Sequence, residues 1–223
     1  AGEVDFALLP VENSITGSIP RIYDLLWFYE RLRIVDELVY RVVQNLIALP
    51  GATLETIREV HSHPVALEQC RSFLGAHHHL HSVIVADTAG AVRAMVAGGD
   101  PSVAAIASQL AAQRYGAHVL APSIQDTADN FTRFLLLQRD GVARRRHGRA
   151  CVALALAHRP GSLRDALSAF AETGMNLRSL VSRPSQDAAF AYRFYCEIEN
   201  VEQPALDRAL AKLSGSSRIL GSY

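Results

Sequence analysis

Residues 139–150, RDGVARRRHGRA, divide the chain into two parts whose apolar residues follow different patterns. The segment is charged, contains two glycines and shows no apolar periodicity. We expect a solvated linker there, although its arginine cluster could instead bind an anion. We place the linker itself at 141–149, between a first domain at 1–140 and a second at 150–223. Each part is long enough to bury a core of its own.

The first part opens with segments that predict strand, helix and strand. An apolar run at 4–10 ends at Pro10 and predicts a short buried strand. Helical spacing follows at 20–32, with Pro20 near the first turn. The run at 33–49 is rich in Val, Ile, Leu and Tyr and partly alternates, so it predicts one long strand.

The rest of the first part repeats a strand, a polar cap and a helix. In 57–76 we expect Ser62 to cap the helix and Gly75 to close it. In 81–100 the cap falls on Asp87 or Thr88, and in 101–120 the helix ends near Gly116. Strands that alternate with helices predict an α/β domain with a largely parallel sheet. Ligands of such sheets lie beyond the carboxyl ends of the strands.

The second part changes to the order β-α-β-β-α-β. Strands are predicted at 150–158, 175–184, 188–200 and 217–223, and helices at 161–174 and 203–214. This is the ferredoxin-like arrangement. It occurs with many activities, so the order alone gives no function.

Composition excludes several classes of protein. The chain has a formal net charge of zero, a pI near 7.3, 49% hydrophobic and 20% charged residues. These values favour a soluble globular protein over a nucleic-acid binder or a disordered tail. No apolar run is long enough to span a bilayer. Cys70, Cys151 and Cys196 are few and widely spaced, which predicts buried, reduced thiols in a cytoplasmic protein and disfavours a disulfide framework, a zinc site or a redox role. Cys151 and Cys196 lie in strand-like runs and could be neighbours in one sheet.

Histidines and carboxylates do not form a recognisable catalytic or metal motif. The run His77 to His81 resembles a metal-binding cluster, because imidazoles bind zinc or nickel. Adjacent imidazoles cannot all converge on one ion without strain, however, and no thiolate or carboxylate is close in sequence. We therefore predict no metal. The acidic residues are dispersed, and AGG at 97–99 follows a helix where a nucleotide fingerprint would follow a strand.

Polar clusters after strands are the remaining candidates for a site. They lie in ENSITGS, HSHPVALEQ, ADT and DNFTRF, and they offer the side chains of Asn13, Ser14, Thr16, Ser18, Ser62, Gln69, Thr88, Asn130, Thr132 and Arg133. Turn and cap residues account for some of them. Together they also suit a small polyanion held by hydroxyls, amides and helix N-termini.

Specific segments resemble the prephenate dehydratases. LLPVENSITGSI (8–19) resembles that family's P-x-E-N-S/T…G segment, HSHPVALEQC (61–70) its S-H-P-x-A-L-x-Q-C, and DTADNFTRFLLL (126–137) its threonine-arginine-phenylalanine signature. RPGSLRDALSAFAETGMNLRSLVSRP (159–184) is similar to the ACT regulatory domain of the same enzymes. The resemblance implies a two-lobed catalytic domain, like that of periplasmic binding proteins, followed by a ferredoxin-like ACT domain.

The resemblance also implies a reaction and its residues. Prephenate loses its ring hydroxyl and its ring carboxylate as CO2 to give phenylpyruvate, on the route to phenylalanine, with no cofactor. Thr132 matches the critical threonine, and we expect its hydroxyl to donate to the departing oxygen. Asn13, Ser62, Gln69 and Thr88 match positions around the substrate. Arg133 either neutralises a substrate carboxylate or braces the loop through an ion pair.

For the second domain the resemblance implies phenylalanine as an effector, bound at an interface in a homodimer or homotetramer. The matching positions are Gly161, Ser162, Leu163, Asn176, Leu177, Ser182, Arg183 and Pro184. Ser162 stands where alanine is usual, and Val181 replaces the glutamate that opens the usual ESRP. The loss of that charge makes inhibition by phenylalanine an open question.

The family normally begins with a glycine-rich segment before VDFALLPVENS, so we expect the catalytic domain to be incomplete at its N-terminus. Two other functions stay open at this point. One is an arogenate dehydratase, which takes the amino-acid analogue of prephenate. The other is a non-catalytic protein, either a two-lobed module that binds a small acid or a remnant in which only the regulatory domain works and binds an amino acid.

Overall fold

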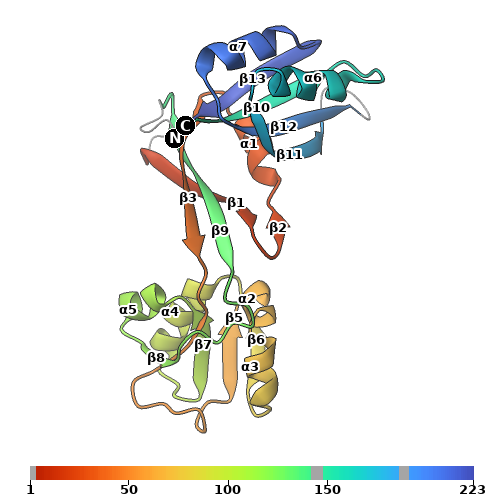
Figure 1. Cartoon of the computed structure of the whole chain (residues 1–223). Coiled ribbons are helices and arrows are strands. Elements are labelled where there is room, and N and C mark those ends of the chain that lie inside the picture. The colour runs from red at the N-terminus through yellow and green to blue at the C-terminus, as the bar shows by residue number, and fades with distance from the viewer. Residues whose placement is uncertain (1–3, 142–147, 186–190) are drawn as a thin grey trace. The chain divides into compact units, whose positions relative to one another are not determined.

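The computed structural model describes residues 4–141, 148–185 and 191–223 (Figure 1). Contacts divide the chain into two compact units. Unit 1 comprises Ala1–Tyr40 and Thr132–Tyr223, and unit 2 comprises Arg41–Phe131. Most of the predicted linker, 142–147, lies outside the described residues.

Unit 1 contains a four-stranded sheet in the order β2-β1-β9-β3. Its strands are β1 (Phe6–Asn13), β2 (Gly17–Ser18), β9 (Phe131–Arg139) and β3 (Leu32–Arg41). The predicted first strand is confirmed, but it runs on past Pro10 to Asn13. β1 and β9 are antiparallel, and Asn13 lies opposite Thr132.

Helix α1 (Arg21–Phe28) begins directly after Pro20, as the sequence predicts. Proline fits this position because its fixed φ suits the first turn and its missing N–H would have no helical acceptor there. Ile22, Tyr23 and Leu26 lie on the buried face of the helix.

The C-terminal part of unit 1 has the predicted ferredoxin-like order. It consists of β10 (Arg149–Leu156), α6 (Ser162–Ala171), β11 (Asn176–Pro184), β12 (Tyr192–Glu199), α7 (Gln203–Ala211) and β13 (Gly215–Ser222). The sheet order is β11-β12-β10-β13, with antiparallel pairs throughout.

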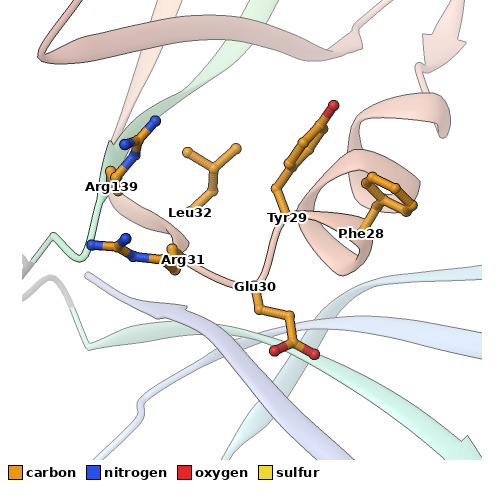
Figure 2. Close-up of a pocket in the computed structure, with 6 residues that line it drawn as sticks. All are labelled: Phe28, Tyr29, Glu30, Arg31, Leu32 and Arg139. Carbon is orange, nitrogen blue, oxygen red and sulfur yellow. The ribbon is translucent and has the colours of Figure 1, made fainter. Parts of the chain in front are cut away.

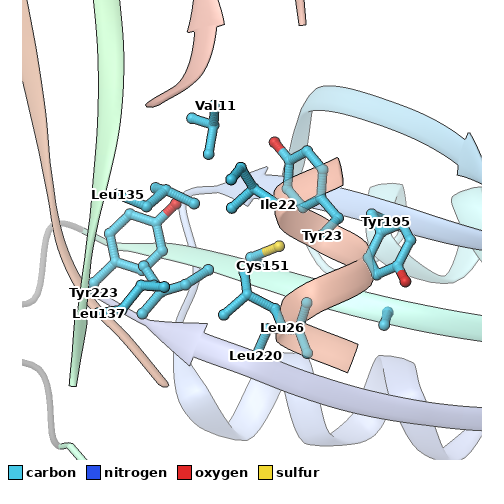
Figure 3. Packing of buried hydrophobic residues seen from close by; sticks show 12 residues of the cluster. Val11, Ile22, Tyr23, Leu26, Leu135, Leu137, Cys151, Tyr195, Leu220 and Tyr223 are labelled. Atoms are coloured by element: carbon cyan, nitrogen blue, oxygen red, sulfur yellow. The ribbon is translucent and has the colours of Figure 1, made fainter. Parts of the chain in front are cut away.

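Both faces of this ferredoxin-like sheet are covered, which explains why β10 is apolar at every position after Arg149. Val152 and Leu154 face the core under α6 and α7. Cys151 and Ala153 face the opposite way, into a second core with Tyr23 and other residues of the first sheet and α1 (Figure 3). The ferredoxin-like sheet and the β2-β1-β9-β3 sheet of unit 1 therefore share one hydrophobic core.

Unit 2 is a five-stranded sheet in the order β6-β5-β7-β4-β8 with helices. Its elements are β4 (Asn45–Ala48), β5 (Glu59–Ser62), α2 (Pro64–Glu68), α3 (Arg71–Ala76), β6 (His81–Ile84), α4 (Thr88–Gly98), β7 (Val103–Ala107), α5 (Gln109–Tyr115) and β8 (His118–Ala121). β5 is parallel to β6 and β7, whereas β4 is antiparallel to β7 and β8. The prediction of a largely parallel sheet is therefore wrong for the β4 side.

The single long strand predicted at 33–49 is also wrong. β3 ends at Arg41 and β4 begins at Asn45, and the two strands belong to different units. The break falls at Gln44, whose backbone N–H donates to the side chain of Gln125 instead of to a strand. Side-chain amides here replace the ladder hydrogen bonds that a continuous strand would need.

The helix predicted in 57–76 is divided into α2 and α3 at Cys70. Its cap is His63, whose Nδ1 accepts from the Val65 N–H, and the predicted cap Ser62 instead donates its hydroxyl to the carbonyl of Ile106 at 2.7 Å. Gly75 lies inside α3 and does not close it. The caps at Asp87 and Gly116 are confirmed.

None of the described helices is long and apolar enough to cross a membrane. The thiols of Cys70, Cys151 and Cys196 are buried and free, as predicted. Cys196 pairs with Val152, next to Cys151, so the last two cysteines lie on neighbouring strands.

Candidate active site

Asn13 and Thr132 form a polar pair at the ends of β1 and β9. The Asn13 Nδ2 donates to the Thr132 hydroxyl oxygen at 3.0 Å, and the Asn13 Oδ1 accepts from the backbone N–H groups of Ile15 and Thr16, each at 3.0 Å. Asn13 is only 9% exposed. Because the Thr132 oxygen accepts, the hydroxyl proton is left to be donated elsewhere. A hydroxyl that accepts one hydrogen bond is also a stronger donor in the next.

Arg133 points into the interior, one residue along β9 from Thr132. Its side chain is 6% exposed, and its Nη2 lies 2.8 Å from a carboxylate oxygen of Glu197 and 3.1 Å from one of Glu12. Its Nη1 lies 3.6 Å from Glu37. Burial lowers the pKa of the guanidinium, but the charge and hydrogen bond of Glu197, with Tyr23 and Tyr223, together raise it by more, so the net pKa lies above its ordinary value. This arrangement favours the bracing alternative for Arg133.

Unit 2 places the other predicted substrate residues at one edge of its sheet. Ser62 ends β5, Thr88 begins α4 just after β6, and Gln69 caps the C-terminus of α2. The carboxyl ends of parallel strands meet at this edge, where α/β sheets bind ligands. Thr88 and Gln69 are half-buried, whereas Ser62 is fully buried and its hydroxyl links β5 to β7. The substrate contact of Ser62 stays a prediction.

A set of amides at the same edge was not anticipated from the sequence. Gln44 is 6% exposed, and its Nε2 donates to the Oε1 of Gln69 at 3.3 Å. Asn45, 3% exposed, donates to the carbonyl of Ala107 and accepts from the N–H of Ser123. The sequence does mark this position, because Gln44 and Asn45 interrupt an otherwise apolar run. The β-branched residues on both sides nevertheless predict one continuous strand, so the sequence pattern alone does not predict a break. Gln44 fixes the orientation of the Gln69 amide.

The predicted effector residues lie around α6 and along β11. Gly161 has φ of 86°, a left-handed conformation that suits glycine, and precedes Ser162, whose hydroxyl donates to the Ala157 carbonyl. Leu163 follows in α6. Asn176 and Leu177 begin β11, and Ser182, Arg183 and Pro184 end it.

Arg183 is held by an ion pair with Asp24 of α1. Its Nε and Nη2 lie 3.0 and 2.7 Å from the same carboxylate oxygen. The hydrogen bond to Asp24 raises the pKa of the guanidinium. Val181, which replaces a glutamate of the family pattern, packs at the border of the shared core. The apolar residue therefore suits its surroundings better than a carboxylate would.

One surface hollow of about 610 Å³ is separate from these residues (Figure 2). It is lined by Phe28, Tyr29, Glu30, Arg31, Leu32 and Arg139. None of the predicted site residues lines it, and Arg31 is already paired with Asp140. The hollow thus has no part in the candidate site.

Histidines 77 and 79 are engaged with the backbone. His77 Nδ1 forms a hydrogen bond with the carbonyl of Phe73 at 2.8 Å, and His79 Nε2 forms one with the carbonyl of Leu54 at 2.9 Å. In the part of the chain that the structure describes, no group of three or more His, Cys, Asp or Glu side chains could hold a metal ion.

The described elements form an α/β part followed by a ferredoxin-like part at the C-terminus. The sequence pattern described as "Prephenate dehydratase" matches residues 1–142. The chain belongs to the prephenate dehydratase family.

Individual relatives agree with this family. Arogenate dehydratase/prephenate dehydratase 2 of Arabidopsis thaliana is 39% identical over 99% of this chain and 61% of its own length. The structure of a prephenate dehydratase from Arthrobacter aurescens in complex with L-Phe is 33% identical, with a TM-score of 0.87, over 100% of this chain and 76% of that one. The chain therefore spans about three fifths of the length of the first curated relatives it matches.

A further similar structure has a different stated activity. GqqA, described as a novel type of quorum quenching acylase, is 33% identical with a TM-score of 0.89, over 100% of this chain and 82% of that one. Similarity at this level is thus found with more than one stated activity, so the reaction of this chain needs an experiment.

Proposed function

We propose that this chain is the catalytic and regulatory part of a prephenate dehydratase, a carbon–oxygen lyase that converts prephenate to phenylpyruvate in L-phenylalanine biosynthesis. The observation that carries the proposal is the 3.0 Å hydrogen bond from Asn13 Nδ2 to the Thr132 hydroxyl. It leaves the threonine proton available for a leaving group at the position that matches the family's critical threonine.

In this reaction the ring C–O bond and the bond to the ring carboxylate break. The carboxylate leaves as CO2, its electron pair completes the aromatic ring, and the hydroxyl leaves with the electrons of the C–O bond. Hydroxide is a poor leaving group, and a neutral alcohol is a weak acid. Thr132 therefore assists by a hydrogen bond that strengthens as charge develops on the departing oxygen, not by full proton transfer.

The substrate dianion needs partners other than Arg133. That guanidinium is buried among Glu12, Glu37 and Glu197, so we assign it to bracing β9. Gln69, Thr88 and Asn13 are proposed to bind the carboxylates and the hydroxyl through amides and hydroxyls. Such groups suit anions without carrying charge.

The test is turnover of prephenate by Thr132→Ala and Thr132→Ser, each compared with the unchanged chain. If the hydroxyl assists departure, kcat of Thr132→Ala should fall roughly 100- to 10,000-fold with little change in KM, and Thr132→Ser should retain most of the activity. A loss below fivefold in Thr132→Ala would show that Thr132 only positions neighbouring groups.

Arogenate is the second candidate substrate, because the Arabidopsis relative is named for both reactions. The two substrates differ in the side chain, which is an amino acid in arogenate and a keto acid in prephenate. The ratio of kcat/KM for the two compounds decides between them. Saturable binding of either without turnover would instead favour the non-catalytic alternative.

L-phenylalanine is the proposed effector, and the C-terminal domain is the proposed ACT domain. Leu177 and Ser182 are five residues apart on an extended strand, a distance of roughly 16 Å, longer than one amino acid. The predicted effector residues at the two ends of β11 therefore cannot all contact one ligand within a single chain. This supports a site completed by a second copy, as a homodimer or homotetramer.

The proposal also includes a cytoplasmic location and a reaction without cofactor. Its effector part is tested by calorimetric titration with L-phenylalanine and by the mass in solution. Binding by a monomer would contradict the shared site.

A further inference from the structure

Glu197, in the ferredoxin-like domain, contacts both α1 and the strand that carries Thr132. It is 3% exposed. Its Oε1 accepts from the Tyr23 hydroxyl at 2.7 Å, and its Oε2 lies 2.8 Å from Arg133 Nη2. Burial and the Glu197 charge raise the pKa of Tyr23, so this phenol stays protonated and donates. Each oxygen of the carboxylate therefore has a different partner.

The cost of burying this carboxylate is offset by its charged partner. An isolated buried charge is strongly unfavourable, and removing one partner of a buried pair leaves the other uncompensated. Arg133 is the cation for Glu197, and the remaining carboxylates near it, Glu12 and Glu37, belong to β1 and β3. The guanidinium thus connects the β2-β1-β9-β3 sheet with β12.

The position of Arg133 gives this connection a consequence for Thr132. Adjacent residues of a strand point to opposite faces, and their orientations are fixed together. On the partner strand, Glu12 lies opposite Arg133 and Asn13 opposite Thr132. A guanidinium held on one face therefore fixes the backbone that presents the threonine hydroxyl on the other.

We propose that Glu197 is a positioning residue for Thr132 that acts through Arg133. Glu197 is paired with Ser179 of β11, the strand that carries five of the proposed effector residues, Asn176, Leu177, Ser182, Arg183 and Pro184. A displacement of β11 or β12 is thereby transmitted to β9. This inference rests on the proposed function, because it assigns Thr132 the catalytic hydroxyl.

The test is the variant Glu197→Gln, which keeps the shape and the acceptor for Tyr23 but removes the charge opposite Arg133. The expected result is a fall in kcat of about 10- to 100-fold, with KM within about twofold of the unchanged chain, as for an interaction felt in the transition state. Glu197→Asp restores the charge and should recover part of kcat.

Glu199→Gln is the matched control. Glu199 lies two residues further along β12, and its oxygen is 3.7 Å from Arg149 and from Arg178. Its variant should keep kcat and KM. Equal losses in Glu197→Gln and Glu199→Gln, or an unchanged kcat in Glu197→Gln, would overturn the inference.

Two further measurements cover the remaining outcomes. If Glu197→Gln does not fold, Tyr23→Phe takes its place, because it removes only the hydroxyl that orients Glu197 Oε1. We then expect a smaller fall in kcat at constant KM. An unchanged kcat in Tyr23→Phe overturns the proposal. If the unchanged chain turns over neither substrate, the proposed function fails. Hydrogen exchange of 131–139 then decides separately, since the inference requires faster exchange in Glu197→Gln than in Glu199→Gln.

Discussion

At the residue scale, the two ends of the Asn13 amide do different things. The oxygen holds the turn after β1, and the nitrogen holds the threonine hydroxyl. In Asn13→Asp the oxygen keeps its backbone donors, but the second oxygen can only accept. The Thr132 proton would then turn towards the carboxylate and away from the substrate. We expect kcat to fall about 100-fold, the size typical for removing one donor at a reacting oxygen, with unfolding stability nearly unchanged.

Asn13→Ala is the comparison, because it removes both ends of the amide. It should lose both activity and stability, the latter by about 1 kcal/mol for the lost turn. Steady-state kinetics and urea unfolding measure the two effects. A fully active Asn13→Asp would show that the hydroxyl does not need this partner.

The cysteines allow a prediction from pKa. Burial raises the pKa of Cys196 to about 12, and burial with Asp126 raises that of Cys70 to about 12. Since thiolate is the reactive form, native thiols at pH 8 should react about a thousandfold more slowly with a thiol reagent than unfolded ones. As pH rises, the thiols of the unfolded chain ionise before those of the folded chain. The buried, protonated thiols therefore contribute fully to the free energy of unfolding below about pH 9, and this contribution is lost as pH rises towards 12. Native labelling at the unfolded rate would contradict this.

Thr132 and Asn13 could be found from the sequence because each lies in a short segment typical of the family. The surroundings of Arg133 could not, because Glu12, Glu37 and Glu197 come from three separate strands. Only the folded chain brings these carboxylates together. The sequence therefore left two roles open for this arginine, and the burial of its guanidinium favours bracing.

At the element scale, α1 has one face in the shared core and one towards solvent. Leu26 is 1% exposed and Leu25 is 36% exposed, so the two leucines form a matched pair. Leu26→Ala should lower the free energy of unfolding by about 2–5 kcal/mol, because it leaves a cavity between α1 and the ferredoxin-like sheet. Leu25→Ala should cost less than about 1 kcal/mol. Equal losses in urea unfolding would show that α1 is not docked in this way.

The type of an element could be predicted where the periodic apolar pattern extends over many residues and a capping residue precedes it, as Asp87 does before α4. The prediction failed at 33–49, where β-branched residues continue across the break and only the amides of Gln44 and Asn45 mark it. It also failed at Ser62, whose hydroxyl has a tertiary acceptor that competes with the local cap. In both places a contact distant in sequence overrides a local preference.

At the scale of the whole molecule, the sequence divides the chain at 141–149, where the order of predicted strands and helices changes. That change does not show which surfaces of the two parts pack together. The contacts group residues 1–40 and 132–223 in one unit, through a core to which α1, β9 and β10 all contribute. Which surfaces of two domains dock depends on side chains that are individually unremarkable in sequence, such as Tyr23 and Tyr195. Docking therefore had to come from the structure.

The ion pair of Arg183 with Asp24 connects a proposed effector residue with α1, so Asp24→Asn tests how the effector signal travels. Both side chains are about one third exposed, so their contribution to stability is about 1 kcal/mol or less. An allosteric coupling is itself only about 1–3 kcal/mol, so the loss of this pair should weaken it measurably. In Asp24→Asn, L-phenylalanine should still bind, but substrate should change its affinity by a smaller factor than in the unchanged chain, as measured by calorimetric titration.

Glu30→Gln is the control for Asp24→Asn, because Glu30 also faces an arginine of the ferredoxin-like domain, Arg218 at 3.5 Å, but is 82% exposed. It should leave the coupling between the two ligands intact. Binding linkage is reciprocal, so L-phenylalanine must change substrate affinity by the same factor in each variant. If Asp24→Asn keeps the full coupling, the signal does not pass through the pair of Arg183 with Asp24. Other described contacts then lead from the ferredoxin-like sheet towards Arg133 of β9, among them Glu197, which pairs with it directly, and Arg178, which pairs with Glu37 beside it.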